Sequence, residues 1–573
     1  MQTAHAVLLP SGRILLASGS SWRNRGPIET YPHTADPQSG RGIFREEEDP
    51  FLINKIEDYY QLVNNVGIYD PSKNTFYRIP HPEPVPDPKW PEHFAPNDFF
   101  CTGHLHVPDG NVLFVGGTQY YYPFRTGHRA TYLFDWRKEV QIRWNNVDWR
   151  RMPSVAFVND STNPWIFAGL MERGRWYATL VPLIDGRLVV LAGFVGFDKG
   201  YPAISENVSS YGTTILDPNS NRIALFGGQP TSAGTFLYQS GTSQGDQRFT
   251  GGRGSRKLEQ FHASIYESNG GHWTLEPSFL GEHPQDDRTM HYALLLPTSQ
   301  ILIINGANYD FYGSIHYPIL LTPQFDNING TFLGYTKKRM NEGVEARLYH
   351  NVALLLPDGR VWISGGGSAR ATIHYTPLAQ KPLVEHNTSS YGQPLPDTSN
   401  IDLDVEMFDD GRLAKNSRGS LSVPTETWVA EIFSPPYLFI DGKRRPVIVS
   451  LSHPHKVDYQ FESVIDGKRY YLLRSNSQYT VNLNYLPTQC ASGTKEKLVM
   501  IKLGSATHGW DNGQRLINLS FTRMSSTSTL LLTTLDARIA LIAPAFYMMF
   551  YVDCMGKPSA AQIIRFDDQA VQP

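Results

Sequence analysis

The stretch that decides the fold is NVALLLPDGRVWISGGG, from Asn351 to Gly367. Two apolar runs of strand length flank a Pro-Asp-Gly turn, and glycines follow the second run. The Asp358-Gly359 pair is typical of a tight hairpin turn, because glycine readily adopts the positive φ that such a turn requires. The stretch therefore predicts a β-hairpin.

The same phrase occurs again in four other places. The copies are HAVLLPSGRILLASGS from His5, GHLHVPDGNVLFVGG from Gly103, TLVPLIDGRLVVLAGF from Thr179 and YALLLPTSQILIINGA from Tyr292. NVGIYDPSKNTFYRIP from Asn65 and TTILDPNSNRIALFG from Thr213 are expected to be outer strand pairs of the same unit. This pattern is typical of Kelch repeats, each of which forms one four-stranded blade of a β-propeller. We therefore predict an all-β protein in which residues 1–422 form a Kelch-type propeller of about seven blades, with two of them hidden in 195–285 and near 375–420.

The repeat stops after about residue 422. EIFSPPYLF, from Glu431, opens a run of short alternating strands without helical periodicity that lasts to the end of the chain. Residues 423–573 are therefore predicted to form an immunoglobulin-like β-sandwich.

Charge and hydropathy exclude several kinds of partner. The chain has 51 Lys and Arg against 54 Asp and Glu, with a formal net charge of −3, which argues against a nucleic-acid binder or a polybasic membrane surface. The longest apolar run, Ile539 to Val552, contains Pro544 and is shorter than the roughly 20 residues that span a bilayer. We expect a pair of buried strands there, and a small molecule or a neutral polymer as partner.

The chain has only three cysteines, which argues against a disulfide scaffold or a zinc finger. Cys490 and Cys554 could pair, leaving Cys101 single. No signal-peptide core follows Met1, so the chain is either a trimmed mature form or a protein that stays in the cell.

Aligning the repeats on their turns brings three unusual residues to one position. Seven residues before the first turn residue, the copies have Cys101, Tyr177 and His350, and the other two copies have Thr3 and Met290. We call this the strand-start position. Equivalent positions of a propeller form a ring around its axis, so these residues should converge at one end of that axis. Tyr349 precedes His350 and can share the site only if the strand is irregular there, since neighbouring strand residues point to opposite faces.

Nitrogen and phenolate ligands of this kind suit Cu(II). A second imidazole would complete the set, and the candidates are His508 or the pair His104 and His106. Taken singly, Tyr and His residues at such positions commonly bind neighbouring loops through hydrogen bonds.

Four motifs, in chain order, resemble the copper–radical oxidase family, which includes galactose oxidase and glyoxal oxidase. They are DFFCTGHL around Cys101, RGRWYATL around Tyr177, EARLYHNVALLLPDGRV around Tyr349 and His350, and SATHG around His508. EIFSPPYLF and APAFYMMFYV resemble the C-terminal sandwich domain of that family.

The resemblance implies one copper per chain, bound by Tyr177, Tyr349, His350 and His508. It implies a thioether between Cys101 and Tyr177 that carries a radical, so that copper and the radical each accept one electron from the substrate. Tyr349 would be the general base. His508 would come from a hairpin of the sandwich domain that plugs the propeller axis. One departure is Val195, flanked by Phe194 and Phe197, where the family stacks a tryptophan over the thioether.

The implied activity is oxidation of a small aldehyde, primary alcohol or hydroxy-carbonyl by O2, which releases H2O2. We expect a secreted or extracytoplasmic monomer that binds no nucleic acid and no membrane, with a carbohydrate as a further candidate substrate. The alternative is a non-enzymatic Kelch propeller that binds carbohydrate or protein. A hydrolase is disfavoured, because no G-x-S-x-G elbow or paired-carboxylate signature stands out.

Overall fold

The structure is a computed structural model, and the residues that it describes are as follows. They are 3–17, 66–79, 82, 99–120, 126–139, 163–171, 174–175, 177–191, 213–217, 222–226, 259–262, 272–275, 291–306, 315–325, 332–345, 347, 350–366, 429–440, 444–453, 470–485, 490, 495–524, 527–538 and 542–568.

The described residues are nearly all β. Apart from strands, they contain two short 3-10 helices, η2 (Trp136–Lys138) and η9 (Pro436–Phe439). No helix within these ranges is long and apolar enough to cross a membrane. The predicted all-β class is confirmed, whereas the Kelch propeller and its blade number remain predictions.

All five copies of the repeated phrase form antiparallel hairpins, as predicted. The hairpins are β1 (His5–Leu8) with β2 (Ile14–Ala17), β5 (Gly103–His106) with β6 (Val112–Val115), β11 (Thr179–Pro182) with β12 (Leu188–Leu191), β17 (Tyr292–Leu295) with β18 (Ile301–Ile304), and β21 (Asn351–Leu355) with β22 (Val361–Gly365). The third turn residue has a positive φ in every copy: Gly12, Gly110, Gly186, Ser299 and Gly359. The positive φ that the sequence predicted for these turns is thus present in the structure.

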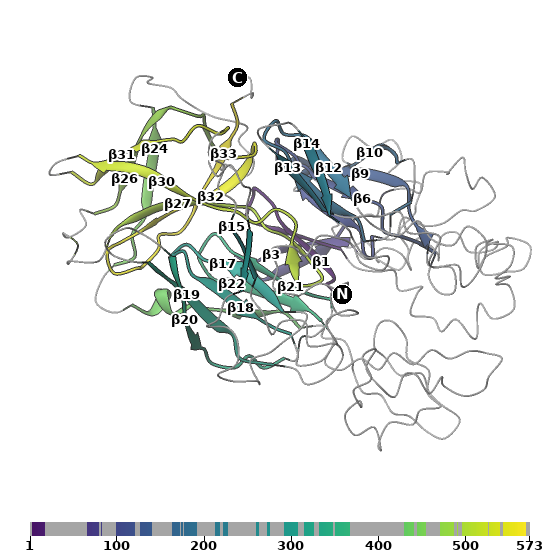
Figure 1. The fold of residues 1–573 in the computed structure, drawn as a ribbon, viewed down its shortest axis with the longest axis horizontal. Helices are drawn as coiled ribbons and strands as arrows, with labels where there is room; N and C mark the ends of the chain where they lie inside the picture. Colours follow the sequence, from purple (N-terminus) through teal and green to yellow (C-terminus); the bar gives the residue numbers. More distant parts are fainter. Residues whose placement is uncertain are drawn as a thin grey trace, which may run out of the picture.

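Outer strands extend three of these hairpins into larger antiparallel sheets (Figure 1). The added strands are β3 (Val66–Asp70) and β4 (Thr75–Arg78) on β2, β9 (Ala130–Phe134) and β10 (Trp165–Leu170) on β6, and β19 (Ile319–Phe325) and β20 (Phe332–Arg339) on β18. Further pairs are β7 (Thr118–Tyr120) with β8 (Thr126–Gly127), β13 (Thr213–Asp217) with β14 (Arg222–Phe226), and β15 (Glu259–His262) with β16 (His272–Leu275). The blade predicted near 375–420 lies outside the described residues.

One strand joins a sheet that we did not expect from the sequence. β23 (Glu431–Phe433), which opens the EIFSPPYLF motif, pairs with β22 of the last hairpin. The motif therefore begins on the sheet of the preceding repeat. The division at residues 422 and 423 remains a prediction.

The C-terminal part forms one eight-stranded sheet. Its order is β24 (Ile448–Ser452), β26 (Gln478–Leu483), β31 (Thr529–Thr533), β30 (Leu516–Arg523), β27 (Lys497–Lys502), β32 (Ala545–Val552), β33 (Gln562–Phe566) and β25 (Tyr471–Leu473). β30 pairs with β27 through its first half and with β31 through its second half. Val481 and Leu532 from one side pack in the same core cluster as Met500 and Tyr547 from the other. The sheet thus folds over a shared core, as the two layers of a sandwich do.

Within the described part of the apolar run, from Ile542 to Val552, the structure has one strand, β32, where we expected a pair. All eight residues of β32 are buried. Pro544 lies directly before this strand, so it limits the strand at its start instead of dividing it.

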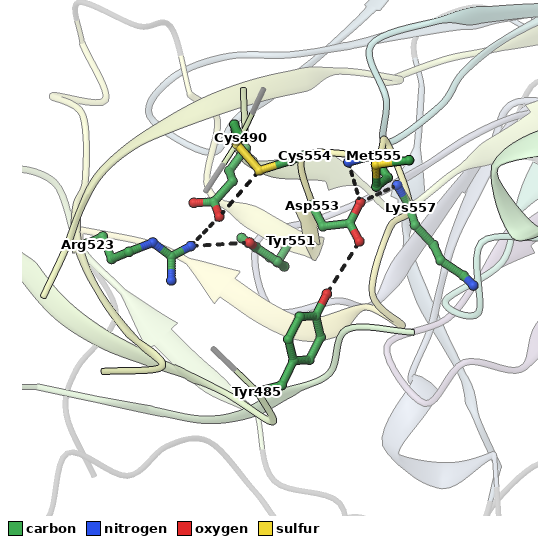
Figure 2. Close-up of a disulfide and its surroundings, with 9 residues drawn as sticks. Tyr485, Cys490, Arg523, Tyr551, Asp553, Cys554, Met555 and Lys557 are labelled. Carbon is green, nitrogen blue, oxygen red and sulfur yellow. Dashed lines mark hydrogen bonds and ion pairs between the residues drawn. A yellow bond between two sulfur atoms is a disulfide. The ribbon is translucent and has the colours of Figure 1, made fainter. Parts of the chain in front are cut away.

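Cys490 and Cys554, which the sequence left as a possible pair, are joined by a disulfide (Figure 2). It links positions 64 residues apart, next to Asp553, whose carboxylate accepts a hydrogen bond from Tyr485. Cys101 is buried and is not part of this disulfide.

A C-terminal hairpin reaches the first sheet. β28 (Ser505–Thr507) pairs with β29 (Trp510–Asp511) and also with β1, so that Thr507 lies opposite His5. The first sheet therefore has the order β29-β28-β1-β2-β3-β4. This pairing places the residues around 508 against the N-terminal strand.

Candidate metal centre

Three residues at the strand-start position share an unusual backbone conformation with His508. Cys101, Tyr177 and His350 have φ values of 58°, 68° and 67°, and His508 has a φ of 49°. Side chains larger than glycine rarely adopt the left-handed region, which costs about 1–2 kcal/mol per residue. These four are half of the eight non-glycine residues with positive φ in the described chain. The backbone thus marks Cys101, Tyr177 and His350, which the repeat alignment selected, and His508 in addition.

The structure brings three of these side chains together. The ligand atoms of Cys101, His350 and His508 all lie within 4.8 Å of one another. Sγ of Cys101 lies 3.3 Å from Nε2 of His508, and the ring centroids of His350 and His508 are 4.8 Å apart. Each of the three residues is at most 2% exposed. Water has little access to this group.

Tyr177 lies at the edge of the same group. Its ring centroid is 5.3 Å from that of His508, nearly perpendicular to it. The side chain packs against the small cluster of Ala4, Phe100 and Cys101. Its backbone N–H donates a hydrogen bond to the carbonyl oxygen of Cys101 (2.9 Å). Tyr177 and Cys101 are therefore neighbours in both backbone and side chain, although they belong to different hairpins.

Neighbouring groups fix the tautomer of His508. The hydroxyl of Thr507 donates to the carbonyl oxygen of Ala4 (3.0 Å), which uses its single hydrogen. The short contact between the Thr507 hydroxyl and Nδ1 of His508 must then have Nδ1–H as donor. Nε2 is left without a proton and faces Cys101. An imidazole held this way is prepared to bind a metal through Nε2.

A second chain of hydrogen bonds runs from Cys101 into the core. The N–H of Cys101 donates to Nε2 of His5 (3.0 Å), so His5 carries its proton on Nδ1 and donates it to Nε2 of His104 (3.1 Å). His104 in turn donates through Nδ1 to the Ser505 hydroxyl (2.7 Å), which donates to the carbonyl oxygen of His104 (2.9 Å). The direction of every bond follows from the backbone N–H at its start.

His104 and His106, the alternative source of the second imidazole, do not join the metal-binding group. Both ring nitrogens of His104 take part in the chain just described, and Nε2 of His106 donates to the carbonyl oxygen of Leu8 (2.8 Å). Burial lowers the pKa of both residues to about 3, with smaller contributions from His106 to the one and from Lys502 to the other. They are neutral core histidines.

The donor set fits copper better than a hard cation. Two imidazoles and a phenol are the ligand types that Cu(II) favours, whereas Ca²⁺ and Mg²⁺ prefer carboxylates and other oxygen donors. The group of Cys101, His350 and His508 contains no carboxylate. The other group of this kind found in the described residues is Cys490, Glu496 and Cys554, where the disulfide occupies both sulfurs.

Tyr349 lies outside the described residues, as do Phe194, Val195 and Phe197. The left-handed φ of His350 does show that the chain is irregular here, which is the condition under which neighbouring residues can serve one site.

Sequence reasoning missed His5, Ser505, Thr507 and Phe100. The ring centroid of Phe100 lies 4.9 Å from that of His350 in an edge-to-face contact. A signal existed for His5, because a histidine inside an apolar inner strand is unusual and lies only two residues after the strand-start residue Thr3.

Comparison with known proteins gives consistent results. The galactose oxidase-like early set domain matches residues 462–566, a segment that contains His508. An aldehyde oxidase of Vitis pseudoreticulata is 27% identical over 533 residues, which cover 82% of each chain. A galactose oxidase of Gibberella zeae is 24% identical over 534 residues, which cover 82% of this chain and 61% of that protein. These matches support the copper–radical oxidase family for this chain. The chain is an oxidoreductase.

A solved structure of a fungal alcohol oxidase in complex with copper is also similar to this chain. It has a TM-score of 0.46 and 16% identity, and the match covers 99% of this chain and 97% of the other.

Proposed function

We propose that this protein uses O2 to oxidise a small aldehyde, a primary alcohol or a hydroxy-carbonyl compound and releases H2O2. The observation that carries the proposal is the buried group of Cys101, His350 and His508 with Tyr177 beside it. Four separate segments supply these residues: three are repeats of the hairpin phrase, and the fourth is the C-terminal hairpin of β28 and β29. A core packed only for stability would have little use for four strained residues at one point.

His350, His508, Tyr177 and Tyr349 would hold one copper ion per chain, Tyr349 on the strength of the family resemblance alone. When bound, copper supplies a one-electron acceptor and a Lewis acid that increases the acidity of the substrate oxygen. The imidazole of His508 is already held with Nε2 free of a proton by Thr507.

Cys101 and Tyr177 would provide the second electron acceptor. A thioether forms when the S–H of Cys101 and a ring C–H of Tyr177 each lose a hydrogen and O2 takes up both as H2O2. The contact of Tyr177 with the Cys101 cluster supports this bond. In turnover, an alcohol loses two electrons and two protons, and O2 again becomes H2O2. Tyr349 would accept the proton of the substrate oxygen.

Both predicted domains would contribute ligands to the proposed copper site. Residues 1–422 would form the propeller that carries most ligands, and residues 423–573 would supply His508. The disulfide between Cys490 and Cys554 supports a secreted or extracytoplasmic location, because such bonds persist in oxidising compartments.

Metal analysis tests the ligand assignment. The purified protein loaded with Cu(II) should contain about one copper per chain, and His350→Ala and His508→Ala should each lose most of it. His316→Ala is the matched control, because Nδ1 of His316 lies at 3.3 Å from the carbonyl oxygen of Gly343, away from the buried group. Full copper occupancy in both site variants would refute the assignment.

Peroxide release tests the activity. The copper-loaded protein, after mild oxidation, should release H2O2 with at least one member of a panel of simple aldehydes, primary alcohols, hydroxy-carbonyls and sugars. The non-enzymatic propeller would be favoured instead if the protein stays copper-free after incubation with Cu(II), releases no peroxide, and binds a carbohydrate or a protein.

A further inference from the structure

Both backbone polar groups of Cys101 are held by specific partners. Its N–H donates to Nε2 of His5, and its carbonyl oxygen accepts from the N–H of Tyr177. Cys101 is in the left-handed region and is 1% exposed, so neither bond can be replaced by water. With both groups held, the direction of the Cα–Cβ bond is fixed. The sulfur then lies next to His508, and Tyr177 packs against the cluster that contains Cys101.

His5 is itself held firmly. It is fully buried on β1, opposite Thr507 of β28. Its Nδ1–H donates to His104, which donates to Ser505 on the same β28 strand. Nε2 of His104 accepts the hydrogen on Nδ1 of His5. Nε2 of His5 therefore carries no hydrogen and can accept the N–H of Cys101.

His5 is not suited to bind copper itself. The ring centroids of His5 and His508 are 5.3 Å apart, so the two rings are neighbours. However, the lone pair on Nε2 of His5 already accepts the N–H of Cys101, and Nδ1 carries the proton given to His104. Neither nitrogen has a lone pair directed at the group of Cys101, His350 and His508.

We propose that His5 is a positioning residue for the thioether, and that His104 and Ser505 serve it by fixing its tautomer. His5 keeps Cys101 in the left-handed conformation in which its sulfur can reach the ring of Tyr177. This inference rests on the proposed function, since it concerns how the bond between Cys101 and Tyr177 forms. It assigns roles to three residues that lie outside the proposed ligand set.

The test follows the cross-link over time after Cu(II) is added in air. Intact mass shows the loss of two hydrogen atoms, and peptide spectra show the linked pair. His5→Ala and His5→Phe both lack the acceptor; the first leaves a cavity and the second keeps the ring volume. Whichever of them folds should form the thioether roughly tenfold or more slowly than the wild type, because a misplaced reacting atom costs this much. Copper content should stay near one per chain.

Two further variants separate positioning from general damage. In His5→Gln the side-chain oxygen can accept the N–H of Cys101, so the rate should return to within about threefold of wild type. His104→Phe leaves His5 without its fixing partner and should give an intermediate rate. His106→Gln is the matched control, because His106 is equally buried on the same strand but donates to Leu8. Its rate should equal that of the wild type.

Each result is decisive. A wild-type rate in the folded His5→Ala or His5→Phe protein overturns the inference and leaves the proposed function intact. Loss of copper in these variants overturns it as well, since His5 would then be a ligand. Failure of His5→Gln to recover the rate also contradicts it. If the wild type itself binds no copper and forms no cross-link, the proposed function fails instead.

Discussion

The two ends of the repeated hairpins use the same backbone conformation for different purposes. At the turn end, the left-handed residue is Gly12, Gly110, Gly186 or Gly359, with Ser299 in the remaining copy. At the strand-start end, left-handed residues are Cys101, Tyr177 and His350. Glycine adopts this conformation without steric cost, whereas the larger residues pay about 1–2 kcal/mol each. At the strand-start end, these three left-handed residues therefore mark a place where the fold gives up stability for the candidate site.

The largest effect should come from removing the sulfur at the strand-start end. Cys101→Ala should keep copper, because sulfur is not a proposed ligand, but should lower turnover at least about a thousandfold, as expected when one member of a catalytic unit is lost. Peroxide release and copper content measure the two quantities. Activity close to wild type in this variant would contradict the radical mechanism.

Strand β5, which lies between the strand-start end and the turn end of the second hairpin, should make the free energy of unfolding depend on pH. Burial holds the pKa of His104 and His106 at about 3, below the value of 6.5 that each has when unfolded. Between pH 6.5 and 3 the unfolded chain binds protons that the folded chain does not, so the free energy of unfolding falls as the pH falls. The expected loss is about 2 kcal/mol per histidine at pH 5.

Chemical denaturation at a series of pH values measures this slope. The slope reports how many protons the chain takes up on unfolding, and His106→Gln should reduce that number by about one, because glutamine does not titrate. An unchanged slope in that variant would mean that His106 is not a buried neutral histidine.

At the turn end, a side chain should cost stability and leave activity unchanged. A Cβ at Gly110 would lie 2.8–2.9 Å from Trp136, Phe546 and Pro10, in addition to the strain of a φ of +89°. Gly110→Ala should therefore lower the free energy of unfolding by about 2–4 kcal/mol. Gly556→Ala is the control, because Gly556 has a φ of +84° with nothing within 4 Å of the added Cβ. It should lose about 1–2 kcal/mol. Equal losses would show that the contacts around Gly110 do not matter.

The smallest effect, and one of opposite sign, should come from Ser299. It has a φ of 70° at the turn position where the other copies have glycine. Ser299→Gly should stabilise the protein by about 1 kcal/mol, because the strain is removed. Thermal unfolding would show this as a small rise in the midpoint. A lower midpoint would mean that the Ser299 hydroxyl, which accepts a hydrogen bond from Lys497, contributes more than the strain costs.

Much of the local structure could be predicted from the sequence. The five hairpins follow from short-range signals: alternating apolar runs, and a glycine or a substitute for it at a fixed turn position. Alignment on those turns also selected Cys101, Tyr177 and His350, because a repeat places equivalent residues at equivalent points of the backbone.

The rest depends on contacts between distant parts of the chain. No local sequence pattern predicts the pairing of β28 with β1 or of β23 with β22, since packing and not sequence distance decides which strands pair. His5 was missed for the same reason: its role exists only because Cys101 and His104, from another hairpin, lie against it. The disulfide is a similar case, because the spacing of its two cysteines did not decide whether they pair.

The pairing of β28 with β1 also sets a time for the assembly of the site. Cys101 and His508 are separated by 407 residues, so a growing chain contains the cysteine long before the histidine. At ordinary rates of synthesis this interval is roughly 20–80 s. During it, the first hairpins can form while Cys101 still lacks the imidazole that will face its sulfur. The group of Cys101, His350 and His508 can therefore assemble only when translation is nearly finished.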